Sequence, residues 1–166
     1  MTDRETAANK YALATRAIHA GQTPDPSTGA VITPIYANST YLHESPGVHK
    51  GLDYGRSHNP TRWALERCVA DLEGGAQGYA FASGMAAASA VLLALKPGAR
   101  IVAPHDMYWS LRNWMIGFAA NWQIGLDFYA DAAELATLLQ RPADLVWAET
   151  PANPTWEILD IARAAE

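Results

Sequence analysis

Short apolar segments alternate with helical segments from residue 77 onward in this 166-residue chain, and this order constrains the fold more than any other feature. The pattern predicts strands at Gln77–Ala82, Arg100–Ala103, Ile124–Tyr129 and Asp144–Glu149. Helices are predicted between them, at Gly84–Leu95, Met107–Ala120 and Ala132–Gln140. Strands that alternate with helices in this way form a mostly parallel sheet covered on both faces. We therefore expect an α/β fold.

Polar and turn-forming residues follow several of the predicted strands. Ser83 follows the first strand, residues 104–108 follow the second, and residues 149–153 follow the last. Ligands of parallel α/β sheets bind at the carboxyl ends of the strands. These residues are therefore expected to converge on one site.

The segment Tyr79-Ala-Phe-Ala-Ser-Gly-Met-Ala-Ala-Ala88 places a tight turn between a predicted strand and a predicted helix. Ser83 can cap the helix, and Gly84 has no Cβ, so a ligand can approach its backbone closely. The free N–H groups and the dipole at a helix start favour an anion. The turn is predicted to bind the phosphate group of a cofactor, although an ordinary strand-to-helix turn is a common alternative.

Residues 1–50 do not show this alternation. A predicted helix at Lys10–Ala20 is followed by residues that interrupt regular structure: Gly21, Pro24, Pro26, Gly29 and Pro34. The segment is either a surface arm or an arm that wraps a neighbouring subunit. The second interpretation is favoured because an apolar arm free in water would be poorly stabilised. Residues 51–166 form the other part, which starts with a polar turn and an amphipathic helix at Thr61–Glu73.

The composition indicates which partners and which cellular compartment to expect. Apolar residues make up 49% of the chain and charged residues only 17%, which indicates that another subunit or further chain covers part of the surface. The net charge of −5, without a basic block, argues against nucleic acid and anionic membranes as partners. The single cysteine, Cys68, and the absence of a signal pattern favour the cytoplasm. The histidines show no metal-ligand spacing, so no metal site is expected.

Four segments carry a resemblance to a known family: Tyr54-Gly-Arg-Ser-His-Asn-Pro-Thr61, Leu72-Glu-Gly-Gly75, Phe81-Ala-Ser-Gly-Met85 and Glu149-Thr-Pro-Ala-Asn-Pro154. They resemble the Cys/Met-metabolism family of pyridoxal 5′-phosphate (PLP) enzymes, from about Thr15 to the last residue. The resemblance implies the large domain of the fold-type-I, aspartate-aminotransferase-like PLP enzymes, of which residues 51–166 would be the N-terminal part. It also implies a homotetramer of closely joined dimers, contacted by the arm at residues 1–50.

The resemblance also assigns residues to the cofactor's phosphate. Tyr54 and Arg56 match the pair that reaches across the dimer to the neighbour's phosphate, and a guanidinium fork suits that group. Without the motif, Arg56 would be interpreted as a solvent-exposed charge in a loop, and Tyr54 as an aromatic residue with a packing role. Ser83, Gly84 and Met85 match the turn that cradles the phosphate with backbone amides.

Three further residues are matched to the cofactor's ring. Tyr108 matches the aromatic residue that stacks on the ring and touches substrate, which makes it the candidate catalytic residue. Asn153 matches the residue bonded to the 3′-oxygen, and Glu149 lies near the ring and positions its neighbours. The alternatives are a core tyrosine at a helix start and a plain strand-end carboxylate.

Two departures from the family pattern stand out. Trp109-Ser-Leu111 stands where the family usually has Gly-Gly-Thr or Gly-Gly-Ser, which affects the shape of the site beside Tyr108. The family's Schiff-base lysine, and the aspartate that pairs with the pyridine nitrogen, are expected beyond Glu166. The lysines present, Lys10, Lys50 and Lys96, match none of its motifs.

The resemblance implies a transsulfuration enzyme that acts on sulfur amino acids. Asn-Pro-Thr at residues 59–61 favours the members that act at Cγ, cystathionine γ-synthase and γ-lyase. Cystathionine β-lyase, methionine γ-lyase and O-acetylhomoserine sulfhydrylase are alternatives. A non-catalytic phosphate-ligand or dimerisation module is an alternative of another class.

Overall fold

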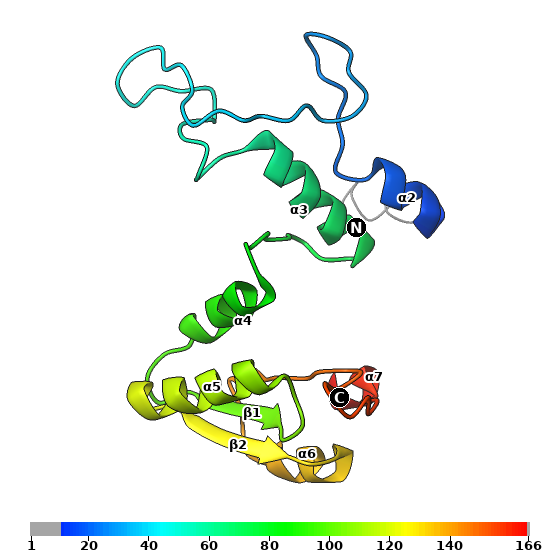
Figure 1. The fold of residues 1–166 in the computed structure, drawn as a ribbon, viewed down its shortest axis with the longest axis vertical. Coiled ribbons are helices and arrows are strands. Elements are labelled where there is room, and N and C mark those ends of the chain that lie inside the picture. The colour runs from blue at the N-terminus through cyan, green and yellow to red at the C-terminus, as the bar shows by residue number, and fades with distance from the viewer. Residues whose placement is uncertain (1–10, 166) are drawn as a thin grey trace. The chain divides into compact units, whose positions relative to one another are not determined.

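The computed structural model describes residues 11–165, and these fall into two units that are described separately (Figure 1). The first unit ends at Ala80 and the second begins at Phe81. The sequence predicted a different division, after residue 50, and that division stays a prediction. The loop at residues 20–59 and the helix that follows it belong to the same unit.

Residues 11–80 of the first unit contain the helices α2 (Leu13–His19) and α3 (Pro60–Leu72), joined by a long loop. Both helices were predicted, although Lys10 lies outside the described residues. Asn59 caps α3 because its side chain accepts hydrogen bonds from the backbone N–H groups of Thr61 and Arg62. Residues 11–80 have isolated β-bridges but no strand, in agreement with the many turn-forming residues of this region.

The start of α3 also holds the loop that precedes it. Asn59 Nδ2 donates to the carbonyl oxygen of Tyr36 at 2.9 Å, and Thr61 Oγ1 donates to that of Pro34 at 3.0 Å. Thr61 Oγ1 also accepts from the N–H of Tyr36 at 2.9 Å. At the other end of the loop, Gly21 has φ +75° and lies so close to α3 that a Cβ would stand 2.6 Å from Cys68 N. The arm is therefore attached to α3 at two places.

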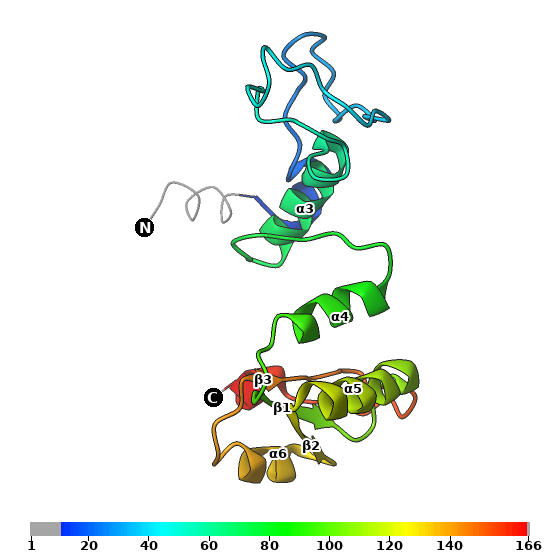
Figure 2. The same ribbon diagram turned by 90° about the vertical axis from the view of Figure 1, so that its left-hand side faces the viewer.

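The second unit is built on a parallel sheet in the order β2-β1-β3. Its strands are β1 (Arg100–Pro104), β2 (Gly125–Tyr129) and β3 (Leu145–Val146). Its helices are α4 (Gly84–Leu93), α5 (Trp109–Trp122), α6 (Ala132–Leu138) and α7 (Ile161–Ala165). Figure 2 shows α5 on one face of the sheet and α6 on the other. The predicted α/β class and the parallel sheet are confirmed.

The core lies on both faces of β1, because its successive side chains point in opposite directions. Ile101 and Ala103 pack in one cluster with residues of α4 and α5, among them Leu92 and Met115. Val102 packs on the other face with Tyr129, Leu135 of α6 and Ala164 of α7. A strand that is apolar on both faces is typical of a covered parallel sheet, which explains why all five β1 residues are buried.

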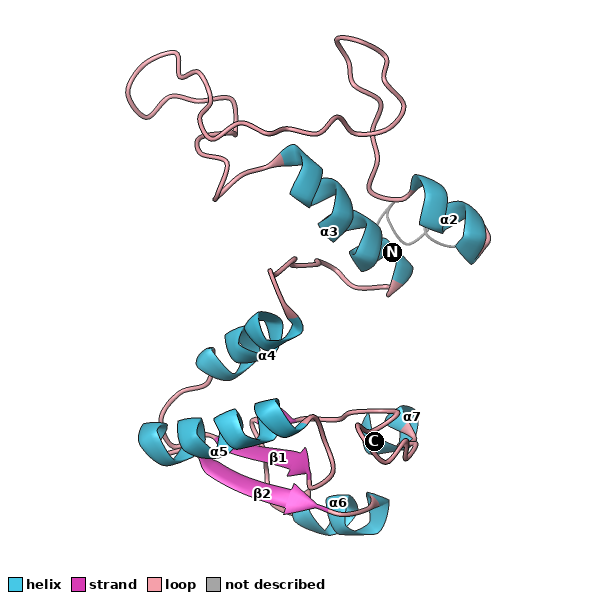
Figure 3. Ribbon diagram, in the orientation of Figure 1, coloured by secondary structure: helices cyan, strands magenta, loops and turns pink. Residues whose placement is uncertain are grey.

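The predicted strand at Gln77–Ala82 does not form, and Figure 3 shows this segment as a loop. A strand needs neighbours for its backbone groups, and no strand among residues 11–165 pairs with this one. Instead, the N–H of Ala80 donates to Glu66 Oε1 of α3 at 3.1 Å. The last predicted strand, Asp144–Glu149, is likewise reduced to Leu145–Val146, the residues that pair with β1.

Candidate active site

The predicted phosphate turn forms the start of α4. Ser83 has an extended backbone, and its Oγ accepts a hydrogen bond from the N–H of Ala86 at 3.1 Å. The N–H groups of Gly84 and Met85 belong to the first turn and have no acceptor within the helix. A Cβ built on Gly84 would meet nothing within 4 Å, so the space beside this turn is open.

Glu149 connects two of the segments that follow strands. Both of its carboxylate oxygens accept from the backbone N–H of Tyr108 at 3.2 Å, and Oε1 also accepts from the N–H of Asn153 at 3.1 Å. Tyr108 stands directly before α5, and Asn153 follows β3. The predicted convergence of these strand-end residues is thus present in the structure.

A cavity of about 450 Å³ lies between the start of α4, the start of α5 and the end of β3. Its lining is mostly apolar: Gly84, Met85, Ala87, Ala88, Val91, Tyr108, Leu111, Trp147 and Glu149. Four of the sequence-predicted residues are therefore in it, namely Gly84, Met85, Tyr108 and Glu149. Ser83 caps the helix beside it, and Asn153 is bonded to Glu149 without lining it. The volume and the apolar walls suit a small aromatic ligand.

The sequence analysis missed Trp147 as a residue of this cavity. Its indole Nε1 is buried and has no hydrogen-bond partner among the residues that the structure describes, which is rare for a buried donor. An open helix start beside Gly84 and an unpaired N–H in Trp147 fit a ligand that carries hydrogen-bond acceptors. The signal was present, because residues 147 and 149 share one face of an extended segment.

Leu111 is the second cavity residue that was not predicted from the sequence. It shows how the departure from the family pattern changes the cavity wall. It is only 4% exposed and contributes an apolar side chain both to the core and to the cavity wall. Trp109 is 73% exposed and does not line the cavity. The wall beside Tyr108 is therefore apolar where the family pattern has a hydroxyl group.

Tyr54 and Arg56 lie in the first unit, and both are exposed. The guanidinium carbon of Arg56 lies 5.0 Å from the centre of the Tyr54 ring. Gly55 between them allows this turn, because a Cβ there would lie 2.5 Å from the carbonyl oxygen of Asn38. Among residues 11–165 the Arg56 side chain has no hydrogen-bond or ion-pair partner, which leaves it free for an anion. Its reach to a neighbour's cofactor stays a prediction.

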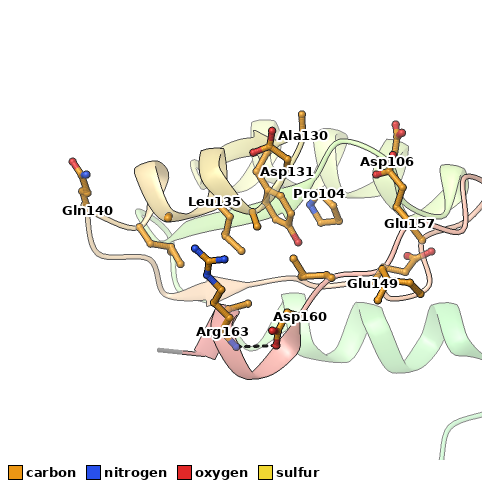
Figure 4. Close-up of a pocket in the computed structure, with 18 residues that line it drawn as sticks. Pro104, Asp106, Ala130, Asp131, Leu135, Gln140, Glu149, Glu157, Asp160 and Arg163 are labelled. Atoms are coloured by element: carbon orange, nitrogen blue, oxygen red, sulfur yellow. Dashed lines mark hydrogen bonds between the residues drawn. The ribbon is translucent and has the colours of Figure 1, made fainter.

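A second cavity, of about 930 Å³, lies on the other face of the sheet between α6, α7 and the segment after β3 (Figure 4). Carboxylates dominate its charge, from Asp106, Asp131, Glu149, Glu157 and Asp160 against Arg163. Burial raises the pKa of Tyr129, whose hydroxyl donates to the carbonyl oxygen of Trp147 at 3.1 Å. This acidic lining is a poor environment for a phosphate group, so the cavity at Gly84 is the better candidate.

Residues 11–165 contain no group of three or more His, Cys, Asp or Glu side chains arranged to hold a metal ion. Within the same range, none of the helices has both the length and the hydropathy needed to cross a bilayer.

Replacing Glu149 by leucine is expected to lower the free energy of unfolding by about 1.5 kcal/mol, because two N–H groups lose a charged acceptor. Glu149→Gln keeps an oxygen in place of Oε1, the atom that accepts from both Tyr108 and Asn153. It should therefore cost much less. Urea unfolding of the full-length protein gives both values, and equal losses would contradict the role assigned to Oε1.

The chain matches a known protein family and named members of it. The family described as "Cys/Met metabolism PLP-dependent enzyme" matches residues 14–166. Cystathionine beta-lyase of Coxiella burnetii is 47% identical over 161 residues, which cover 95% of this chain and 41% of that protein. Cystathionine gamma-lyase of Dictyostelium discoideum is 41% identical over 165 residues, which cover 97% of this chain and 42% of that protein.

Solved structures agree with this match. The crystal structure of metB from Corynebacterium glutamicum aligns with a TM-score of 0.88 at 37% identity, covering 95% of this chain and 42% of that one. Cystathionine gamma synthase of Xanthomonas oryzae pv. oryzae, in complex with cystathionine, aligns with a TM-score of 0.86 at 36% identity, covering 94% and 41%. The chain thus spans about two fifths of these relatives. The resemblance is confirmed: the chain belongs to the Cys/Met metabolism family of PLP-dependent enzymes.

Proposed function

We propose that the full-length protein carrying this chain is a PLP-dependent transsulfuration enzyme that forms or breaks a carbon–sulfur bond at Cγ of a sulfur amino acid. The observation that carries the proposal is the cavity in which Gly84, Tyr108 and Glu149 meet. Its open helix start suits a phosphate and its apolar wall suits a ring. The relatives named as cystathionine lyases and synthases support the substrate class.

The preference for Cγ rests on Asn59-Pro60-Thr61. These residues also cap α3 and hold the loop at residues 34–36, so the motif has a structural role beside any role in substrate choice. Cystathionine β-lyase is the first alternative, since a relative of that name is 47% identical. Methionine γ-lyase and O-acetylhomoserine sulfhydrylase are further alternatives.

The residues of the cavity have distinct roles in this proposal. PLP supplies an electron sink for a carbanion of the substrate, chemistry that side chains lack. The N–H groups of Gly84 and Met85 and the hydroxyl of Ser83 hold the phosphate. Tyr108 lines the cavity and would hold the ring, and its phenol is a group that could hold a proton beside a bound substrate. Glu149 fixes the backbone of Tyr108, and the Asn153 amide would be the group that bonds the ring's 3′-oxygen.

A second copy of the chain completes the site in this proposal, within a homodimer that pairs into a homotetramer. Its Tyr54 and Arg56 would bind the phosphate from the other side. Support comes from Arg56, whose side chain has no hydrogen-bond or ion-pair partner within residues 11–165, and from apolar residues of the first unit that are strongly exposed: Val31, Ile32, Ile35 and Leu42, at 67%, 73%, 86% and 92%. Apolar surface of this kind usually has a partner. We place the enzyme in the cytoplasm.

The full-length protein is expected to bind PLP with a pyridoxal-type absorbance band and to release or consume thiol with a cystathionine-type substrate. Gly84→Val adds a side chain to the open space at the phosphate turn. It should weaken PLP binding about 10- to 100-fold, the loss expected when hydrogen bonds to a charged group are displaced. PLP titration of the cofactor-free protein measures this change.

Gly117→Val is the matched control. Gly117 lies in α5, outside the cavity lining, and a Cβ there would also meet nothing within 4 Å. It should leave the affinity for PLP unchanged. A wild-type protein without a pyridoxal band, even with added PLP, would favour the non-catalytic phosphate-ligand or dimerisation module instead.

A further inference from the structure

Arg62 lies in the first turn of α3, and all three nitrogens of its guanidinium group contact acceptors of the same chain. Nη1 donates to the carbonyl oxygen of Arg56 at 2.9 Å, and Nη2 donates to that of Ser57 at 2.7 Å. Nε forms an ion pair with Glu66 Oε1 at 3.2 Å. Three directed contacts from a planar group hold the side chain in one orientation, as a lysine could not.

The two carbonyl groups belong to the loop that presents Tyr54 and Arg56. Tyr54 closes this loop, since its carbonyl oxygen accepts from the N–H groups of Ser57 at 3.0 Å and His58 at 2.8 Å. Arg62 binds the backbone at Arg56 itself, while the guanidinium of Arg56 is exposed and has no hydrogen-bond or ion-pair partner in the described part of the chain. One arginine therefore fixes the loop, and the other is left free to bind an anion.

Glu66 extends this network to Ala80, the last residue of the first unit. It is only 15% exposed, and the oxygen that pairs with Arg62 also accepts from the N–H of Ala80 at 3.1 Å. Ala80 precedes Ser83 by three residues. One carboxylate thus ties the loop at residues 54–58 to the segment that leads into the turn at residues 83–85.

We propose that Arg62, supported by Glu66, is a positioning residue for phosphate recognition. It acts through Tyr54 and Arg56 by holding the backbone from which they project, and it does not touch the phosphate. This inference rests on the proposed function, in which Tyr54 and Arg56 bind the phosphate of PLP.

The test compares two probes on the full-length, cofactor-free protein: PLP, and pyridoxal, which lacks the phosphate. Arg62→Met should weaken PLP binding about tenfold, the lower end of what the loss of a supporting residue costs at metal sites. The affinity for pyridoxal should stay within twofold of wild type, since the loop acts on the phosphate alone. Arg62→Lys should restore little, because it cannot bind both carbonyl groups.

Arg67→Met is the matched control on the same helix. Arg67 also donates to a backbone carbonyl, that of Gly21, from Nε at 3.3 Å and Nη2 at 3.2 Å. It has no bond to the loop at residues 54–58, so it should change neither affinity. If Arg62→Met does not fold, Glu66→Gln takes its place in the test. The glutamine oxygen can still accept from the N–H of Ala80, whereas the ion pair with Arg62 is lost.

The outcomes separate this inference from the proposed function. The proposed function would be refuted if the wild-type protein did not bind PLP. The phosphate-binding role of Arg56 would be refuted if Arg56→Met did not weaken the affinity for PLP more than the affinity for pyridoxal. If Arg56→Met discriminates between the probes and the Arg62 and Glu66 variants do not, the positioning role is wrong. Equal weakening of both probes by Arg62→Met would also overturn it, since that result indicates a general structural defect.

Discussion

Replacing Arg100 by methionine is expected to lower the free energy of unfolding by about 3 kcal/mol, the lower end of the cost of removing one partner of a buried ion pair. Arg100 is only 8% exposed although it is charged. Its guanidinium pairs with Asp127 at 2.7 Å and donates to the carbonyl oxygens of Arg141 at 2.9 Å and Leu138 at 3.2 Å. The methionine fills the space but leaves these acceptors without donors.

The expected loss of unfolding free energy depends on how far water can replace the contacts of Arg100. Asp127 is 38% exposed and regains some hydration, which keeps the loss below the upper end of the range. The carbonyl groups at the end of α6 and in the turn after it lose a charged donor that joins them to β1. Urea unfolding of the full-length protein gives the free energy, followed by the fluorescence of its tryptophans.

Arg141→Met is the control for this prediction. The backbone carbonyl of Arg141 accepts from Arg100, but Arg141 is an exposed residue. The same change there should alter the free energy of unfolding by less than about 0.5 kcal/mol, as expected for surface substitutions. Similar losses in both variants would show that charge, rather than the buried contacts of Arg100, produces the effect.

The Arg100 network could not be predicted from the sequence, and the reason is physical. Its partners lie 27 to 42 residues away, and an arginine at the start of an apolar segment gives no local signal of burial. By contrast, the strands around it were predicted from their apolar pattern. Hydrophobic periodicity is local information, whereas a polar network depends on topology.

The predicted strand at Gln77–Ala82 illustrates the same limit. The residues have the right composition, yet strand formation depends on a neighbour, and residues 11–165 provide none. The Ser83 cap was predicted because a cap depends only on residues three positions apart. The meeting of Tyr108 and Glu149 was predicted from topology, since both follow strands of one parallel sheet. Arg62 was missed because tertiary contacts alone give it a role.

At a PLP concentration that saturates the wild type alone, hybrid dimers are expected to recover the PLP binding that both parent variants have largely lost. Arg56→Met would remove the guanidinium that serves the neighbour's site, and Gly84→Val would block the chain's own phosphate turn. In a dimer with one chain of each kind, one site combines an intact Gly84 with the partner's intact Arg56. The other site carries both defects. The hybrid should therefore hold about half the cofactor of the wild-type dimer, as twofold symmetry requires.

The measurement uses two differently tagged full-length chains, co-expressed and purified through both tags, and reads the pyridoxal absorbance per dimer. If Arg56 served its own chain's site instead, each site of the hybrid would contain one defect and no binding would return. A double variant, with both changes in one chain and a wild-type partner, is the control. When Arg56 acts across the interface, each of its sites keeps one defect, so this dimer should bind little PLP. The two hybrids contain the same substitutions in different arrangement, so more PLP in the first hybrid than in the control arises only from a site shared by two chains, and the reverse order would show that Arg56 serves its own chain.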